Sequence, residues 1–259
     1  MSKSVLVGNR IFGGERFSVI AGPCAVESRE QILEIGRRVR EDGASALRGG
    51  AFKMRTDPRS FQGLGLEALA LIDEVRKATG LPYIVEVASP EQIGPLIEHA
   101  DALQVGSRNM HNGYLLKELG KTRKPVLLKR GLAAFLSEWL LAAEYITGGG
   151  NEEIILCERG VRTFEHETRN TLDLAGAVWV KQRSRFPVIV DPSHGTGRPE
   201  LIGPMCMAAA AAGLDGVMIE VHNDPAAALS DGAQALDLDQ LAVILRDLRP
   251  LLGSLGRSL

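Results

Sequence analysis

Short apolar runs alternate with longer segments of helical period along most of the chain, and a polar loop follows each run. Runs of this length, apolar almost throughout, are typical of strands buried on both faces of a parallel sheet. We predict eight strands, at Ser18–Ala21, Ala44–Arg48, Tyr83–Val87, Ala102–Val105, Val126–Lys129, Ile154–Cys157, Val188–Asp191 and Val217–Glu220. Residues 1–16 precede this alternation and contain two short apolar runs on either side of Gly8-Asn9, a pattern that predicts a small β-hairpin.

Capping residues and glycines mark where helices begin and end between these strands. Ser28 with Gln31, and Ser89-Pro90 with Gln92, have the spacing of helix starts closed by a capping box. The pattern also predicts a helix from about Ala134 to Thr147, which the run Gly148-Gly149-Gly150 ends. A last helix, Asp237–Leu248, places Leu238, Leu241, Leu245 and Leu248 on one stripe.

Eight β/α units in 259 residues predict an α/β protein with a single (β/α)8 TIM barrel over residues 17–259, preceded by the hairpin of residues 1–16. An open doubly wound sheet is the alternative. It is less favoured because no Gly-x-Gly-x-x-Gly follows the first strand and no break in period divides the chain. The barrel leaves no residues for a regulatory domain, so we expect no built-in regulatory module.

Composition narrows the function classes. A formal net charge of −2 without a basic run predicts no nucleic-acid partner and no anionic membrane partner. No apolar stretch approaches ~18 residues and the N-terminus lacks a signal-peptide pattern, so a cytoplasmic protein is expected. Three cysteines, an odd number in a long chain, argue against a disulfide framework and for free thiols in a reducing compartment.

Basic residues follow several of the predicted strands, at the end of a β/α barrel where active sites lie. Guanidinium and ammonium groups bind phosphate and carboxylate, so this mouth suits a substrate with several negative charges. Gly49-Gly50 and Gly106-Ser107 would also let backbone amides approach an anion closely. The basic side chains are Arg48, Lys53 and Arg55 after the second strand, Arg108 after the fourth, Lys129 at the end of the fifth and Arg159 after the sixth.

A second group of polar residues follows the seventh, eighth and first strands, which are neighbours in a closed barrel. Cys24, His194, Glu220 and either Asp224 or Asp231 can therefore converge. One thiol, one imidazole and two carboxylates suit a divalent transition metal such as Mn, Fe, Co or Zn. On chemistry alone two other roles stay open, with Cys24 as a small buried apolar residue and His194 as a general acid or base.

With these residues assembled, the sequence resembles the 3-deoxy-D-arabino-heptulosonate 7-phosphate (DAHP) synthases, in the short, barrel-only form related to the octulosonate-phosphate synthases. The similarity runs from about Phe17 to Leu248. Its motifs are Ala21-Gly-Pro-Cys-Ala-Val-Glu-Ser28, Leu47-Arg-Gly-Gly-Ala-Phe-Lys53, Ser60-Phe-Gln-Gly-Leu-Gly65, Gly106-Ser-Arg-Asn-Met110, Leu128-Lys-Arg130, Cys157-Glu-Arg-Gly160, Asp191-Pro-Ser-His-Gly-Thr-Gly-Arg198 and Ile219-Glu-Val-His222.

The resemblance implies an aldol-type condensation of phosphoenolpyruvate with erythrose 4-phosphate that releases phosphate, the first step of the shikimate pathway and of aromatic amino acid biosynthesis. It further implies one divalent metal ion (Mn, Fe, Co or Zn) and a homotetramer or homodimer. Proton transfer is assigned to Lys53 or His194. The implied metal ligands are Cys24, His194, Glu220 and, in preference to Asp224, Asp231. The implied phosphoenolpyruvate contacts are Arg48, Lys53, Ser107, Arg108, Lys129 and Arg159, and the aldose-phosphate contacts are Arg55 and Thr56.

The acceptor sugar and a non-catalytic role define the competing hypotheses. Met54 stands where the heptulosonate enzymes usually have Pro, and Asn223-Asp224 replaces their usual Pro-Glu, so the same chemistry with arabinose 5-phosphate or another aldose phosphate is the first alternative. Thr56 and Pro192-Ser193 favour the four-carbon acceptor within the resemblance. The remote alternative is a non-catalytic scaffold for chorismate mutase, which is also a candidate partner of an active enzyme.

Overall fold

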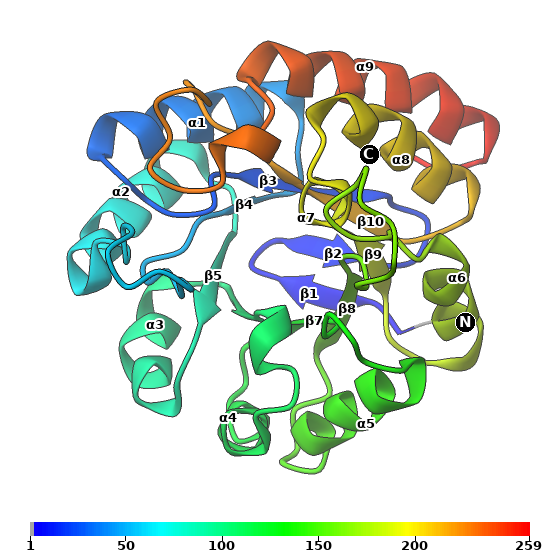
Figure 1. The fold of residues 1–259 in the computed structure, drawn as a ribbon, viewed down its shortest axis with the longest axis horizontal. Coiled ribbons are helices and arrows are strands. Elements are labelled where there is room, and N and C mark those ends of the chain that lie inside the picture. The colour runs from blue at the N-terminus through cyan, green and yellow to red at the C-terminus, as the bar shows by residue number, and fades with distance from the viewer. Residues whose placement is uncertain (1–2) are drawn as a thin grey trace.

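The computed structural model describes residues 3–259 and contains the predicted closed barrel of eight parallel strands. Strand order follows chain order, and the last strand pairs with the first of the barrel, Glu220 lying opposite Gly22. Figure 1 shows the helices as a ring around these strands. The barrel strands are β3 (Ser18–Gly22), β4 (Ala46–Arg48), β5 (Tyr83–Val87), β6 (Ala102–Val105), β7 (Val126–Lys129), β8 (Ile154–Glu158), β9 (Val188–Val190) and β10 (Gly216–Glu220).

Helices connect successive strands and cover the outside of the barrel. They are α1 (Arg29–Asp42), α2 (Ala68–Thr79), α3 (Ile93–His99), α4 (Gly113–Gly120), α5 (Leu136–Thr147), α6 (Leu174–Arg183), α7 (Pro192–Thr196), α8 (Pro199–Ala211) and α9 (Leu238–Ser254). Single 3-10 turns occur at η1 (Gly65–Glu67), η2 (Pro90–Gln92), η3 (Ser107–Asn109) and η4 (Gly232–Gln234). Within residues 3–259, no helix combines the length and the apolar character needed to cross a membrane.

The predicted hairpin is present and lies across one end of the barrel. Strand β1 (Val5–Val7) pairs antiparallel with β2 (Arg10–Phe12), and Figure 1 shows both across the centre of the ring. The hairpin buries Val5, Val7 and Phe12 against the apolar layer inside the barrel. The Lys3 N–H donates to the Arg185 carbonyl just before β9, so the hairpin covers the amino-terminal ends of the strands. The opposite end stays open for the polar residues.

The two-residue alternation of a strand determines which side chains face into the barrel. A layer of apolar residues lies inside it, at Ile20, Ala46, Ile84, Ala102, Leu127, Ile155, Ile189 and Met218. Two residues further along the chain, towards the carboxyl end of each strand, most of the side chains are polar. They are Arg48, Glu86, Gln104, Lys129, Asp191 and Glu220, and this polar layer forms the floor of the site.

Some predicted boundaries were wrong. The strand predicted from Ala44 begins at Ala46, and the last helix extends to Ser254 instead of ending at Leu248. The strand predicted to end at Asp191 ends at Val190, because the Asp191 side chain accepts the His194 N–H and caps the single-turn helix α7. That turn replaces the loop expected after the seventh strand.

Neither predicted capping box has the expected bonds. Ser28 does cap α1 by accepting the Gln31 N–H, but the Gln31 side chain accepts the N–H of Glu27 instead of that of Ser28. Ser89 makes no side-chain cap bond, and Gln92 accepts the N–H of Ala88. The reason for the second difference is that a 3-10 turn, tighter than the α-helical turn that a capping box requires, begins at Pro90.

Candidate active site

A cavity of about 400 Å³ opens at the carboxyl-terminal ends of the strands. This volume suits a small molecule with polar groups. The cavity is lined by all eight residues predicted to bind substrate: Arg48, Lys53, Arg55, Thr56, Ser107, Arg108, Lys129 and Arg159. Arg162 and Arg169 add two further guanidinium groups, whereas the acidic residues in the lining are Asp57, Glu86 and Asp231. The cavity is therefore strongly basic although the whole chain is slightly acidic.

Several of these guanidinium groups have buried nitrogens without a hydrogen-bond partner. They are Nε and Nη2 of Arg48, Nη1 of Arg55 and Nη1 of Arg159, although Arg48 Nη2 also lies in an ion pair 3.5 Å from Glu220 Oε2. Buried donors are normally paired, and an unpaired one in a cavity indicates a ligand. Arg48 and Arg159 are only 3% and 5% exposed, so these donors cannot turn fully into bulk water. Anionic groups of a substrate would complete their bonding.

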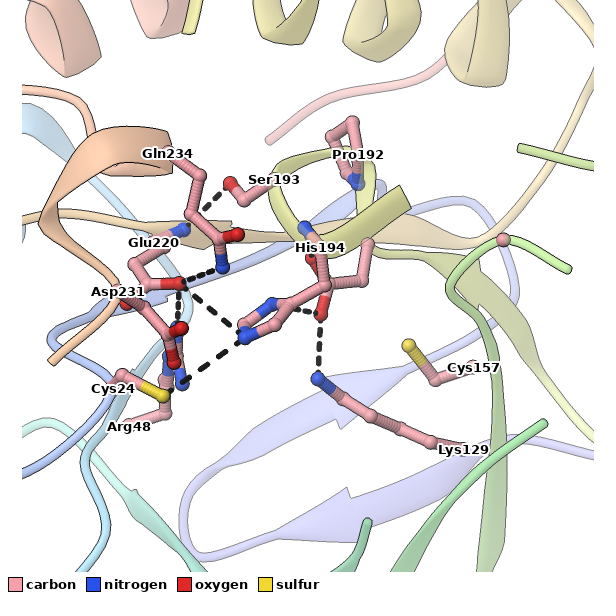
Figure 2. A network of polar contacts seen from close by, with 12 residues as sticks. Cys24, Arg48, Lys129, Cys157, Pro192, Ser193, His194, Glu220, Asp231 and Gln234 are labelled. Carbon is pink, nitrogen blue, oxygen red and sulfur yellow. Dashed lines mark hydrogen bonds and ion pairs between the residues drawn. The ribbon is translucent and has the colours of Figure 1, made fainter. Parts of the chain in front are cut away.

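The four predicted metal-binding residues converge beside this cavity. One ligand atom from each of Cys24, His194, Glu220 and Asp231 lies within 4.8 Å of the others. His194 Nε2 is 3.3 Å from Glu220 Oε2 and 3.9 Å from Cys24 Sγ. Figure 2 shows the side chains of Cys24, Glu220 and Asp231 on the same side of the His194 ring. Asp224, the alternative carboxylate, is not in this cluster; its N–H donates to His222 Nδ1 instead.

Local structure explains how each of these side chains reaches the cluster. Glu220 ends β10, Cys24 follows β3, and His194 lies on α7 directly after β9, so three neighbouring strands supply three of the residues. Asp231 comes from the long loop after β10. It has φ 54°, and it is the one residue other than glycine with positive φ within residues 3–259. This conformation costs free energy and persists where the surrounding structure fixes it.

Asp191 orients the imidazole ring of His194 from behind. Its Oδ2 lies 2.8 Å from His194 Nδ1 and accepts a 2.5 Å bond from Lys129 Nζ, while its Oδ1 accepts the His194 N–H. A carboxylate facing Nδ1 leaves the Nε2 lone pair directed at the cluster, as in many histidines that bind metals. Burial lowers the pKa of His194 to about 3, so the ring is neutral at physiological pH.

The other donors have pKa values that reflect a buried site rich in negative charge. Burial, and then the charge of Glu220, raises the pKa of the Cys24 thiol to about 12. Burial likewise raises the pKa of Glu220 to about 7, against the opposing charge of Arg48. Burial would raise the pKa of Asp231 as well, but the ammonium of Lys53 outweighs it and holds this pKa well below its ordinary value.

Lys53 lies at the border between the ligand cluster and the cavity. Its Nζ donates to Asp231 Oδ2 at 2.5 Å and also contacts Cys24 Sγ. Burial would lower the pKa of Lys53, but the charges of Cys24 and Asp231 raise it above the ordinary value. The ammonium therefore stays charged. A cation contacting these donors indicates that the cluster attracts positive charge.

The donor set fits a divalent transition metal ion. It combines a thiol, an imidazole with a free lone pair and two carboxylates, which are the ligand types that Mn, Fe, Co and Zn accept. Burial raises the pKa values of Cys24 and Glu220, so the charged forms of both donors need a positive charge beside them. A metal ion would supply that charge.

Sequence reasoning missed several residues of the site. Glu86 and Gln104 line the cavity, joined by a 2.6 Å bond from Gln104 Nε2 to Glu86 Oε2. The two-residue alternation beyond Ile84 and Ala102 would have placed both inside the barrel. Arg169 was not predicted either. It donates to the side-chain oxygen of Gln234, and the side-chain nitrogen of Gln234 donates to Glu220 Oε2 at 2.8 Å. No spacing rule connects these last residues, because they lie on different loops.

A buried ion-pair network supports the cavity wall at β7 and β8. Arg130 Nη1 lies 3.1 Å from Glu158 Oε2 and 2.8 Å from Asp173 Oδ2. Glu158 is fully buried, and its Oε1 accepts the N–H of Gly160. The network holds the segment around Arg159 against the neighbouring strand end, which carries Lys129.

Comparison with known proteins places these features in a group of related sequences and structures. Residues 3–252 match the model of the DAHP synthetase I family. A phospho-2-dehydro-3-deoxyheptonate aldolase of Thermotoga maritima is 44% identical over 250 residues, which is 96% of this chain and 74% of the relative. A 2-dehydro-3-deoxyphosphooctonate aldolase of Desulfatibacillum aliphaticivorans is 35% identical over 272 residues, covering 96% of this chain and 97% of the relative.

Solved structures agree with the sequence matches. The crystal structure of the Thermotoga maritima DAHP synthase superposes with a TM-score of 0.96 at 43% identity, over 99% of this chain and 75% of that protein. A truncated form of the same enzyme superposes with a TM-score of 0.93 at 40% identity, over 99% of this chain and 94% of that form.

Proposed function

The chain belongs to the DAHP synthetase I family, and from this premise we propose that it condenses phosphoenolpyruvate with erythrose 4-phosphate. The products are 3-deoxy-D-arabino-heptulosonate 7-phosphate and phosphate. The observation that carries the proposal is a basic cavity with unpaired buried guanidinium nitrogens directly beside a cluster of four metal-ligating side chains. The cavity suits two phosphorylated substrates, and the cluster suits a group that polarises an aldehyde.

Binding and orientation come from the cations of the cavity. Arg48, Arg159 and Arg108 would hold the phosphate and carboxylate of phosphoenolpyruvate, with Lys129 and the Ser107 amide assisting. Arg55 and Thr56, on the loop after β4, would hold the phosphate of the aldose. Fixing both anions brings C3 of phosphoenolpyruvate next to the aldehyde carbon, which converts a bimolecular step into an effectively unimolecular one.

The reaction forms one carbon–carbon bond, and at C2 a carbon–oxygen bond to water replaces the carbon–oxygen bond to phosphate. C3 attacks the aldehyde carbon, water adds to C2 with loss of a proton, and phosphate leaves C2 as the ketone forms. A divalent metal ion bound by Cys24, His194, Glu220 and Asp231 would supply Lewis-acid polarisation of the aldehyde oxygen.

Lys53 is the residue that we assign to proton transfer. Its ammonium is charged and lies at the border of the ligand cluster, so it can donate a proton to the developing alkoxide. His194 is less suited to this step, because it is neutral and its Nε2 faces the other ligands. We therefore assign His194 to metal binding.

Erythrose 4-phosphate is the proposed acceptor because the similarity to the heptonate enzyme, at 44% identity, exceeds that to the octonate enzyme, at 35%. Met54, which stands where the heptulosonate enzymes usually have Pro, is the reason for a second candidate acceptor. Its sulfur accepts a 3.4 Å bond from Asn109 Nδ2, which ties the aldose-binding loop to η3. An aldose phosphate of another length, such as arabinose 5-phosphate, is the alternative. A homodimer or homotetramer and an association with chorismate mutase are predictions from sequence alone.

Phosphate release tests the proposal. The purified chain is incubated with phosphoenolpyruvate and either erythrose 4-phosphate or arabinose 5-phosphate, each with EDTA or with added Mn²⁺. We expect release with erythrose 4-phosphate and Mn²⁺, and loss of release with EDTA. Faster release with arabinose 5-phosphate would overturn the assignment of the acceptor, and equal release in EDTA would overturn the metal requirement.

A further inference from the structure

A largely covered carboxylate outside the cavity joins two of the loops that carry the ligand cluster. Glu27 follows β3 in the same loop as Cys24, and its side chain is 9% exposed. Both of its carboxylate oxygens accept the backbone N–H of Leu229, each at 3.1 Å. Leu229 lies two residues before Asp231. Glu27 therefore connects the loop of one metal-binding residue to the loop of another.

His222 completes this connection from the end of β10. The Asp224 N–H donates to its Nδ1 at 3.0 Å, and its Nε2 lies 3.3 Å from Glu27 Oε2 and 3.0 Å from Gln31 Nε2. Glu27 itself is fixed to the barrel, because its N–H donates to the side chain of Gln31 on α1. The backbone of Glu27 is thus bonded to α1, and its carboxylate is bonded to the loop of Asp231.

The loop that Glu27 holds contains the strained residue of the site. Asp231 has φ 54°, a conformation that needs support from its surroundings. Downstream, the Gln234 N–H donates to the Asp231 carbonyl, and the Gln234 side chain donates to Glu220. Upstream, and within the described chain, no hydrogen bond other than those to Glu27 joins residues 225–230 to a segment outside their loop. Glu27 is the upstream anchor.

We propose that Glu27 is a positioning residue that holds Asp231 at the distance from Cys24 needed to bind a divalent metal ion. The inference rests on the proposed function for the presence of the metal, and it adds a residue that touches neither substrate nor metal. Removing a partner that orients a ligand typically weakens metal binding about 10- to 100-fold. We expect a loss of this size for Glu27→Gln, which keeps the shape of the side chain but has one acceptor oxygen fewer.

The test measures binding of Co²⁺ to the metal-free full chain, by titration against a competing chelator. Glu34→Gln is the matched control. Glu34 also lies on the outside of this region and also bonds the loop, through Asn223 Nδ2 at 2.8 Å, but it is exposed, so we expect a change of less than about threefold. Glu27→Asp tests whether the length of the side chain matters when its charge is kept. It keeps the charge but is shorter, and we expect it to weaken binding as Glu27→Gln does.

A double-mutant cycle shows whether Glu27 acts through Asp231. In the Asp231→Ala background, Glu27→Gln should change Co²⁺ affinity by less than about twofold, because the ligand that it positions is gone. The thiolate-to-Co²⁺ absorption should persist in Glu27→Gln, since Cys24 still binds. Additive losses in the cycle, or full affinity in Glu27→Gln, would overturn the inference alone. Failure of the wild-type chain to bind Co²⁺ would overturn the metal site as well, so the two failures are distinguishable.

Discussion

The affinity of the ligand cluster for a metal ion should rise with pH in a way that identifies its donors. A metal ion binds deprotonated ligands, so each donor that holds a proton in the metal-free protein must release it. Cys24, with a pKa raised to about 12 by burial, releases one proton at any pH below that value. Glu220, with a pKa raised to about 7, releases a second one below pH 7. His194, at about 3, and Asp231, whose pKa is strongly lowered, release none near neutral pH.

These values predict the size of the effect. Between pH 5 and pH 6 both donors lose protons on binding, so affinity should rise about 100-fold; between pH 8 and pH 9 only Cys24 does, and the rise should be about tenfold. The assay is a titration of the metal-free chain with Co²⁺ at each pH, against a chelator of known affinity. Cys24→Ser removes the thiol proton, so its affinity should be nearly constant between pH 8 and pH 9.

A constant affinity of the wild-type chain between pH 8 and pH 9 would refute this reasoning. It would mean that Cys24 does not bind as a thiolate, or that its thiol is already ionised in the metal-free protein. An unchanged slope in Cys24→Ser would have the same consequence, because another group would then be releasing the proton.

Three further predictions concern single residues. Lys53→Met should lower kcat by about 10²- to 10⁴-fold in the phosphate-release assay while strengthening Co²⁺ binding, because the ammonium no longer contacts Cys24 and Asp231; weaker metal binding would contradict the assignment. Arg130→Met leaves Glu158 buried without its partner and should cost about 3 kcal/mol, or roughly 6–12 °C in Tm by thermal unfolding. Adding Glu158→Gln should recover part of that loss, and purely additive losses would argue against the pair. Gly22→Ala should lower the Tm of the barrel and raise the KM for phosphoenolpyruvate. Gly22 has a φ of 148°, and a Cβ there would clash with the carbonyl oxygen of Arg48. An unchanged KM would show that Arg48 does not shift.

The barrel could be predicted from the sequence because its signals are local. An apolar run such as Tyr83–Val87 and a polar loop after it suffice to place a strand and its carboxyl end. The basic residues of the cavity follow from that placement, since Lys129 and Arg159 lie at or just after strand ends. Several predicted strand bounds shifted by one or two residues, as at Asp191, which caps α7 instead of ending a strand.

The contacts within the site could not be predicted in the same way. Lys53 reaches Asp231 across 178 positions of sequence, and Glu27 reaches Leu229 across 202. Such pairs depend on the conformation of loops, for which the sequence carries no periodic signal. Glu86 and Gln104 differ, because the alternation of their strands places them inside the barrel once its inner layer is known.

The most direct test of the account is the mass of the product formed from phosphoenolpyruvate and erythrose 4-phosphate by metal-free protein, before and after Mn²⁺ is restored. We expect no product without metal and, with Mn²⁺, a seven-carbon 3-deoxy keto acid phosphate released together with one equivalent of inorganic phosphate. Equal product formation by the metal-free protein, or phosphate release without a new carbon–carbon bond, would contradict it.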